Sequence, residues 1–301
     1  MKGTRSLATA EALTAIALWA LSFILIKIAL RELSPATLIV VRFGVAALVV
    51  GLAAGTRGSL PRVSRHDLVG LAVLGAIGVT LHQLLQVIGQ TSTDAGMAAL
   101  CAATAPAFIV VLAAVFLGER LGRWQLLGVL LAIAGAALVS VGGDWSSVRN
   151  ARYMSLGNLL VLLSAMVWAA STIIGKHMMR KRSSSLITGG SLFFGWLFAL
   201  PVFLAGKGWR EIPGLSVRGW AAIVVLGVFC TAIAHLANNH ALRHIPAQRI
   251  AVIQNLEPFL AVVGAWLILG EKMSAPMLAG GAAIIAGVYL TERFSAWAAD
   301  Q

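Results

Sequence analysis

Charge is scarce in this sequence, and the scarcity excludes a water-soluble protein. Only 11% of the 301 residues are Asp, Glu, Lys or Arg, whereas 59% are hydrophobic. Soluble domains carry roughly 25% charged residues. With a mean hydropathy of +0.90, the chain has too few polar side chains to cover a globule in water.

Cysteines are few, and the common cofactor motifs are absent. Cys101 and Cys230 both lie within apolar runs, so they indicate neither a disulfide framework nor a metal site. The sequence contains no G-x-x-x-x-G-K-[ST] loop for ATP and no H-E-x-x-H zinc motif. We therefore expect no catalytic residue, no metal, no cofactor and no enzyme activity.

Acidic residues are outnumbered by basic ones. The chain has 11 Asp and Glu residues and 23 Lys and Arg residues, which gives a net charge of +12. In a soluble protein this excess would suggest nucleic acid as a partner. Here the basic residues concentrate between apolar runs and no aromatic-basic stripe follows them. We expect them to set membrane topology and expect no nucleic-acid partner.

Long apolar runs fill most of the chain. About 20 apolar residues suffice to cross a lipid bilayer as a helix, and the joining loops leave no room for a soluble domain. We predict an all-α integral membrane protein with ten transmembrane helices. The predicted helices cover residues 8–30, 35–54, 67–90, 94–117, 124–142, 155–178, 186–206, 217–240, 246–269 and 275–294.

The distribution of Lys and Arg predicts the orientation. Basic residues concentrate on the cytoplasmic side of membrane proteins, and this bias is met if both termini are cytoplasmic. The Ala- and Gly-rich composition and short loops favour a multi-pass protein of a bacterial inner membrane. The basic residues that this topology places inside are Lys2, Arg5, Arg57, Arg62, Arg65, Arg120, Arg123, Lys176, Arg180, Lys181, Arg182, Arg243, Arg249 and Arg293.

The chain repeats itself. WALSFILIK at 19–27 returns as WAASTIIGK at 168–176, and LGER at 117–120 returns as LGEK at 269–272. We predict a first five-helix repeat over residues 1–150 and a second over 151–301. Because five is odd, the second repeat enters the membrane inverted. Inverted repeats recur in secondary transporters, where exchange of conformation between the halves gives alternating access to a central site.

The ends of the two repeats carry a family resemblance. They read APAFIVVLAAVFLGERL (105–121) and EPFLAVVGAWLILGEKM (257–273). With the ten runs, this pattern resembles the EamA family of the drug/metabolite transporter superfamily over nearly the whole chain, and within it the YddG-type exporters of aromatic amino acids. The resemblance implies a monomeric transporter that carries small molecules outward.

Two Trp–Ser pairs are candidates for the central site. Trp19 and Ser22 lie one turn apart, and Trp168 and Ser171 repeat the arrangement. A Trp ring can stack on an aromatic substrate or hold a cation on its face. The alternative is that the hydroxyl residues only pack helices together.

Two further stripes combine a histidine with an amide. His82 and Gln86 lie one turn apart in the third predicted helix, and His235 and Asn238 do so in the eighth. Polar groups in a bilayer usually face the bundle interior. These four side chains would suit a zwitterion such as an amino acid. Each histidine can instead be a satisfied packing residue.

Glu257 is the most unusual residue, because it lies within the ninth predicted helix directly before Pro258. An intramembrane carboxyl group is a functional hypothesis by default, and it could bind a substrate ammonium or a proton. Alternatively, it serves the backbone locally, where Pro258 frees a carbonyl.

Other notable residues have structural interpretations. Lys27, near a helix end, is expected to snorkel to the headgroups, and Glu119 and Glu271 to cap or pair locally. Small residues predict close packing of helices five and ten, within one chain or between two. The tryptophans expected in an interfacial belt are Trp124, Trp145, Trp209, Trp220, Trp266 and Trp297.

The sequence thus predicts a secondary transporter that exports amino acids and related metabolites, driven by a gradient. A multidrug or organic-cation exporter is the alternative, since Glu257 with two tryptophans would suit a lipophilic cation. An intramembrane enzyme built on His82, His235 and Glu257 is the rival from another class, without a motif to support it.

Overall fold

The protein is described here from a computed structural model that covers residues 2–55, 63–117, 122–141, 156–179, 182–244, 253–254 and 256–299. These residues form helices and short connections, without strands in the described ranges. Several residues with sequence interpretations lie outside the described part, namely Arg57, Arg62, Glu119, Arg120, Trp145, Arg180, Lys181 and Arg249.

The chain is an all-α membrane protein, as predicted. Among the described residues, six helices are long and apolar enough to cross a membrane, and four further apolar helices are shorter. Each lies within or close to one of the ten predicted runs. The first-half elements are α1 (Lys2–Ala29), α2 (Pro35–Gly55), α3 (Arg65–Leu74), η1 (Gly75–Leu81), α4 (His82–Thr91), α5 (Ala95–Ala102), α6 (Ala105–Leu117) and α7 (Arg123–Val141).

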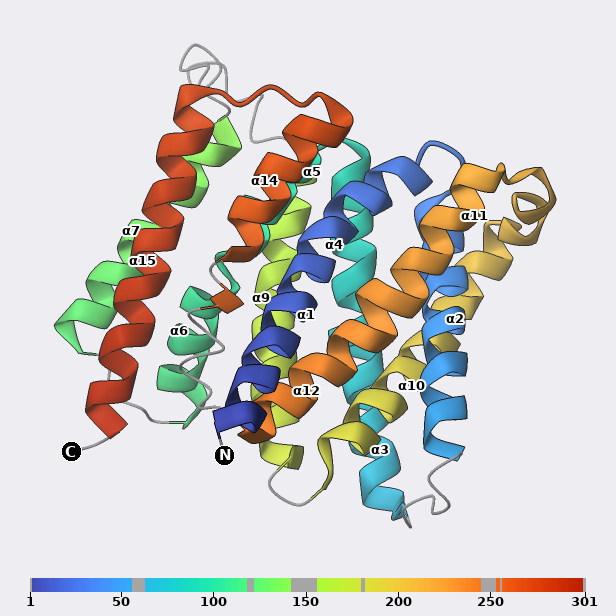
Figure 1. Cartoon of the computed structure of the whole chain (residues 1–301), viewed down its shortest axis with the longest axis horizontal. Coiled ribbons are helices and arrows are strands. Elements are labelled where there is room, and N and C mark those ends of the chain that lie inside the picture. Colours follow the sequence, from blue (N-terminus) through green and yellow to red (C-terminus); the bar gives the residue numbers. More distant parts are fainter. Residues whose placement is uncertain are drawn as a thin grey trace.

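The second half repeats this order (Figure 1). Short 3₁₀ turns η2 and η3 join its second and third helices, and capping serines begin two of its helices: Ser183 accepts from Leu186 N and Ser216 from Gly219 N. The elements are α9 (Leu156–Met179), α10 (Ser184–Ala205), η2 (Gly208–Arg210), η3 (Ile212–Gly214), α11 (Val217–Val224), η4 (Val225–Ile233), α12 (Ala234–His244), α14 (Leu256–Leu269) and α15 (Ala275–Ala299).

The first helices of the two halves run in opposite directions. Lys27, near the end of α1, donates to the carbonyls of Gln90 (2.8 Å) and Thr93 (2.7 Å) where α4 ends. The start of α9 meets the same end of α4, where Thr93 donates to Asn158 at 2.9 Å. The repeat is therefore inverted, as predicted. The snorkelling expected of Lys27 is wrong, because its ammonium group instead donates to two carbonyls at the end of α4.

The third and eighth runs share a feature that the sequence did not predict. Each contains a π-helical segment, η1 and η4. Thr80 donates to the Gly75 carbonyl (3.2 Å) and Thr231 to the Leu226 carbonyl (2.8 Å), five residues earlier in each case. Such local π-helices are frequent at functional sites. Here His82 directly follows η1, and His235 lies two residues after the end of η4.

Helices α7 and α15 pack along most of their length within the one chain. A Cβ atom at Gly135 would lie 2.6 Å from the Gly280 carbonyl oxygen, and one at Gly280 would lie 2.7 Å from that of Gly135. The predicted contact between helices five and ten is thus confirmed, and it lies inside the monomer. Only glycine permits so close an approach of two backbones.

Polar contacts join the halves at both ends of the bundle. At one end Glu32 accepts from Ser216 N (2.8 Å) and Oγ (2.7 Å). At the other, Arg182 holds Asp67 with two contacts of 2.6 and 2.8 Å. The Ser216 hydrogen bonds hold the pKa of the Glu32 carboxyl below its usual range. Its contribution to stability is therefore complete above the ordinary carboxyl pKa and is lost as the pH falls through the lowered value.

The repeated LGER/LGEK motif has a structural role in its second copy. Glu271 accepts hydrogen bonds from Ala95 N (2.7 Å) and Gly96 N (3.0 Å), so it caps α5. Capping was expected, but the prediction that it is local is wrong, because the capped helix belongs to the other half. A carboxylate also suits the positive end of the helix dipole.

Glu271→Gln is expected to lower the free energy of unfolding by about 1 kcal/mol, the usual cost of a lost helix cap. The apparent melting temperature in detergent measures the effect. Lys272→Gln, at the exposed neighbouring position, is the control and should melt like the wild type. Equal melting of the two variants would contradict the capping role.

Candidate functional site: a central cavity between the two halves

A cavity of about 220 Å³ lies at the centre of the bundle and is lined by both halves. One enclosed water needs only roughly 10–15 Å³ on such a measure, so the cavity has room for a small solute. The walls are α1, α2, η1, α4, α5 and α6 from the first half, and α9, α10, η4, α12, α14 and α15 from the second.

Each repeat contributes a tryptophan that contacts a histidine of the other repeat. Trp19 lies against His235 with ring centroids 5.3 Å apart, and Trp168 lies against His82 at 5.1 Å. All four side chains line the cavity. The inverted repeat therefore brings two equivalent Trp–His pairs to the one site, from helices that are distant in sequence.

Backbone carbonyls orient both imidazole rings. His82 Nδ1 is 3.0 Å from the Ser164 carbonyl oxygen, and His235 Nδ1 is 2.7 Å from that of Thr231. A carbonyl can only accept, so Nδ1 carries the hydrogen in each ring. A neutral ring then keeps Nε2 as an acceptor. The two rings can receive hydrogen bonds from a bound solute.

Two helices begin at the cavity, each with a proline in its first turn. The fourth predicted run is not continuous, because a turn at Ala103 and Thr104 separates α5 from α6 before Pro106. In the second half α14 begins at Leu256, just before Glu257 and Pro258. Glu257, predicted to lie within the ninth helix of residues 246–269, thus stands in the first turn of α14. Proline suits a first turn, where its missing N–H costs no hydrogen bond, and a carboxylate suits the helix N-terminus.

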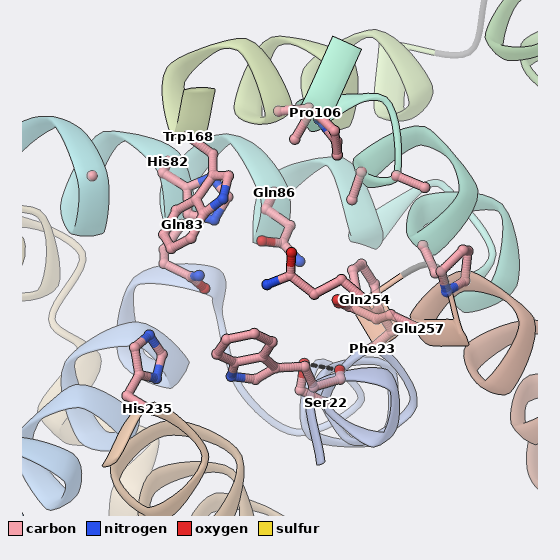
Figure 2. Close-up of a pocket in the computed structure, with 18 of the residues that line it drawn as sticks. Ser22, Phe23, His82, Gln83, Gln86, Pro106, Trp168, His235, Gln254 and Glu257 are labelled. Atoms are coloured by element: carbon pink, nitrogen blue, oxygen red, sulfur yellow. Dashed lines mark hydrogen bonds between the residues drawn. The ribbon is translucent and has the colours of Figure 1, made fainter. Parts of the chain in front are cut away.

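The amide groups of Gln86 and Gln254 and the carboxyl group of Glu257 are directed toward the same part of the cavity. Figure 2 shows Gln86 and Gln254 pointing toward one another from opposite sides, with Glu257 beside Gln254. Gln86 is only 6% exposed. Both hydrogen-bond donors and acceptors are thus directed into the cavity.

Seven of the nine predicted site residues line the cavity, namely Trp19, Ser22, His82, Gln86, Trp168, His235 and Glu257. Ser171 and Asn238 are not among the lining residues. Ser171 packs against Gly78 and donates to the Trp168 carbonyl at 2.8 Å. Ser22 likewise donates to the Trp19 carbonyl, at 2.7 Å. Helical spacing could not tell which of these residues line the cavity, because it shows which residues share a helix face but not what that face packs against.

The sequence analysis missed Arg42 and Gln83 as lining residues. Arg42 lies on α2, is 5% exposed, and donates from Nε to Thr231 Oγ1 at 2.9 Å. The rule that intramembrane charges face a functional interior could have found it. Gln83 follows His82, so the helical stripe that selected His82 and Gln86 left it out.

A polar cavity at the centre of two antiparallel helical repeats is typical of a membrane transporter. The model of the EamA-like transporter family matches this chain twice, over residues 8–141 and 155–293. The chain belongs to that family.

Relatives cover nearly the full length of the chain. A Streptantibioticus cattleyicolor protein described as a probable terminal-alkyne amino-acid exporter is 33% identical, over 91% of this chain and 90% of the relative. An uncharacterized transporter of Archaeoglobus fulgidus is 30% identical, over 91% and 93%. A crystal structure that is 21% identical superposes with a TM-score of 0.67, over 94% of this chain and 97% of the other, and has the same fold.

Proposed function

We propose that this transporter exports amino acids, aromatic and other neutral ones, and related small metabolites by alternating access. The observation that carries the proposal is the pair of Trp–His contacts, Trp19 with His235 and Trp168 with His82, around one cavity. Aromatic faces accept an apolar side chain, while imidazole, amide and carboxyl groups suit a zwitterionic backbone. The amino-acid exporter among the relatives supports this substrate class.

The inverted halves supply the mechanism of the proposal. Two halves of one fold and opposite orientation can exchange conformations, which opens the cavity first to one side and then to the other. We place both termini in the cytoplasm and the protein, as a monomer, in a bacterial inner membrane. The domain boundary of the proposal is the one expected from the sequence, with the repeats at 1–150 and 151–301.

An organic-cation or multidrug exporter is the second candidate. Glu257 and the two tryptophans of the cavity favour it, since a carboxylate and aromatic faces attract cations. Arg42 in the same cavity opposes it, because a buried guanidinium repels a cation. An amino acid carries both charges and is therefore the better fit.

Uptake into proteoliposomes tests the proposal. Wild type is expected to move radiolabelled amino acids, and His82→Ala to reduce uptake by roughly 10-fold or more, since one hydrogen-bonding and one ring contact are removed. Leu130→Ala, at an exposed apolar position of α7, is a control that should transport normally. Transport of a lipophilic cation without any amino acid would overturn the substrate class and favour the second candidate.

Glu257→Gln distinguishes the energy source in the same assay. If Glu257 carries the coupling proton, a pH gradient accelerates wild-type uptake and the variant loses this response, because a glutamine side chain does not titrate. Uptake by wild type that ignores the pH gradient would assign Glu257 to substrate binding alone.

A further inference from the structure

Arg42 is a buried cation of the cavity that has no carboxylate partner among the described residues. Its side chain is 5% exposed and lines the cavity from α2. Among the described residues, the recorded ion pairs are Asp67 with Arg182 and Glu11 with His240, so neither involves Arg42. A buried charge is costly unless it is paired and hydrogen-bonded. A bound anion would compensate the charge of Arg42 in the cavity.

The protein orients Arg42 but leaves most of its donors available. A guanidinium has five N–H donors, and within the described chain Nε donates to Thr231 Oγ1 at 2.9 Å. Thr231 in turn donates to the Leu226 carbonyl at 2.8 Å, which leaves its oxygen to accept from Arg42. The guanidinium also lies 5.3 Å from the centroid of the Phe43 ring. The π-helical segment η4 thus fixes one edge of the planar guanidinium group of Arg42.

The acidic residue of the cavity, Glu257, belongs to a different wall from Arg42. Glu257 stands in the first turn of α14, which packs on α1 and α5, whereas α2 packs on α10, α4 and η4. Figure 1 places α14 and α2 on different sides of α1. The two side chains are not recorded as an ion pair, although both line the cavity. One solute that carries both charges could satisfy both walls.

We propose that Arg42 binds the carboxylate of the transported amino acid, and that Glu257, with Gln86 and Gln254, receives its ammonium group. The inference rests on the proposed function and adds the orientation of the substrate within the site. A planar guanidinium matches a carboxylate with two parallel hydrogen bonds. The substrate side chain then lies toward the tryptophans of the two halves.

Competition between an amino acid and its amide tests this inference. Phenylalanine and phenylalanine amide have nearly the same shape, but the amide lacks the negative charge. If phenylalanine is not transported, the fastest amino acid of the uptake screen and its amide replace this pair. Wild type should be inhibited by the acid at a concentration roughly 10- to 100-fold lower than by the amide, as expected for charge-assisted hydrogen bonds.

Arg42→Gln should bring this ratio close to one, and Arg42→Lys should give an intermediate ratio because Lys keeps the charge without the fork. Leu130→Ala, at an exposed apolar position of α7 outside the cavity, is the control and should keep the wild-type ratio. If Arg42→Gln does not fold, as judged by size-exclusion chromatography, the Lys variant decides: unchanged inhibition by both compounds overturns the inference.

Two further outcomes separate this inference from the proposed function. Wild type that transports amino acids but responds equally to acid and amide overturns the role of Arg42 and leaves the function standing. Wild type that transports no amino acid overturns the proposed function itself.

Discussion

Valine at Gly135 or Gly280 is expected to disrupt the pairing of α7 with α15 and to destabilise the fold strongly. The new Cβ would lie 2.6 or 2.7 Å from a backbone carbonyl oxygen of the other helix. Backbone cannot move aside as a flexible side chain can, so the helices must separate along their shared length. We expect a loss of at least about 3 kcal/mol, at the upper end of the usual cost of overpacking.

The apparent melting temperature in detergent measures this loss, which should be about 10 °C or more. Gly51→Val is the matched control, because a Cβ at Gly51 in α2 would meet nothing within 4 Å. It should leave the melting temperature nearly unchanged. A Gly280→Val variant that melts like Gly51→Val would show that the two backbones do not approach closely.

Removal of either cavity tryptophan should cause the second large effect. Trp19→Ala and Trp168→Ala each delete a ring that lines the cavity and contacts a histidine of the other half. Loss of one large apolar contact costs about 2 kcal/mol, which corresponds to a roughly 30-fold loss of uptake efficiency. Because the two pairs are equivalent in the inverted repeats, the two variants should lose similar factors.

The measurement is initial uptake of radiolabelled phenylalanine into proteoliposomes over a range of concentrations. Trp220→Ala is the control for a tryptophan outside the cavity, since Trp220 is 40% exposed on α11 and was predicted to lie at the membrane interface. It should keep nearly full uptake. Equal losses in all three variants would mean that the tryptophans act through stability, whereas loss in only one cavity variant would contradict the equivalence of the halves.

Much of the fold could be predicted because the bilayer constrains it strongly. A span of about 20 apolar residues must satisfy its backbone internally, and a helix does so alone. Each of the six long apolar helices and four shorter ones among the described residues therefore lies within or close to a predicted run. The repeated stretches at Trp19 and Trp168 also predicted the inversion, since an odd number of crossings reverses the second copy.

The breaks within the spans were not predictable from apolar character. Pro106 and Pro258 were visible, but the hydropathy of the fourth and ninth runs hides the point at which each helix begins. The π-helical segments likewise form where tertiary contacts are made, such as the hydrogen bond from Thr80 to the Gly195 carbonyl of the other half at 2.8 Å. These features determine where Glu257 and the histidines lie, and so the site.

By itself, the sequence determined that this protein spans a membrane as two related halves and contains polar residues that must face inward, because exposure of polar groups to lipid is costly. Only the tertiary structure decided which of them meet. Trp19 and His235 come from different halves, as do Arg42 and Thr231, and periodicity within one helix contains no information about its partner. The cavity exists because helices distant in the chain pack around it.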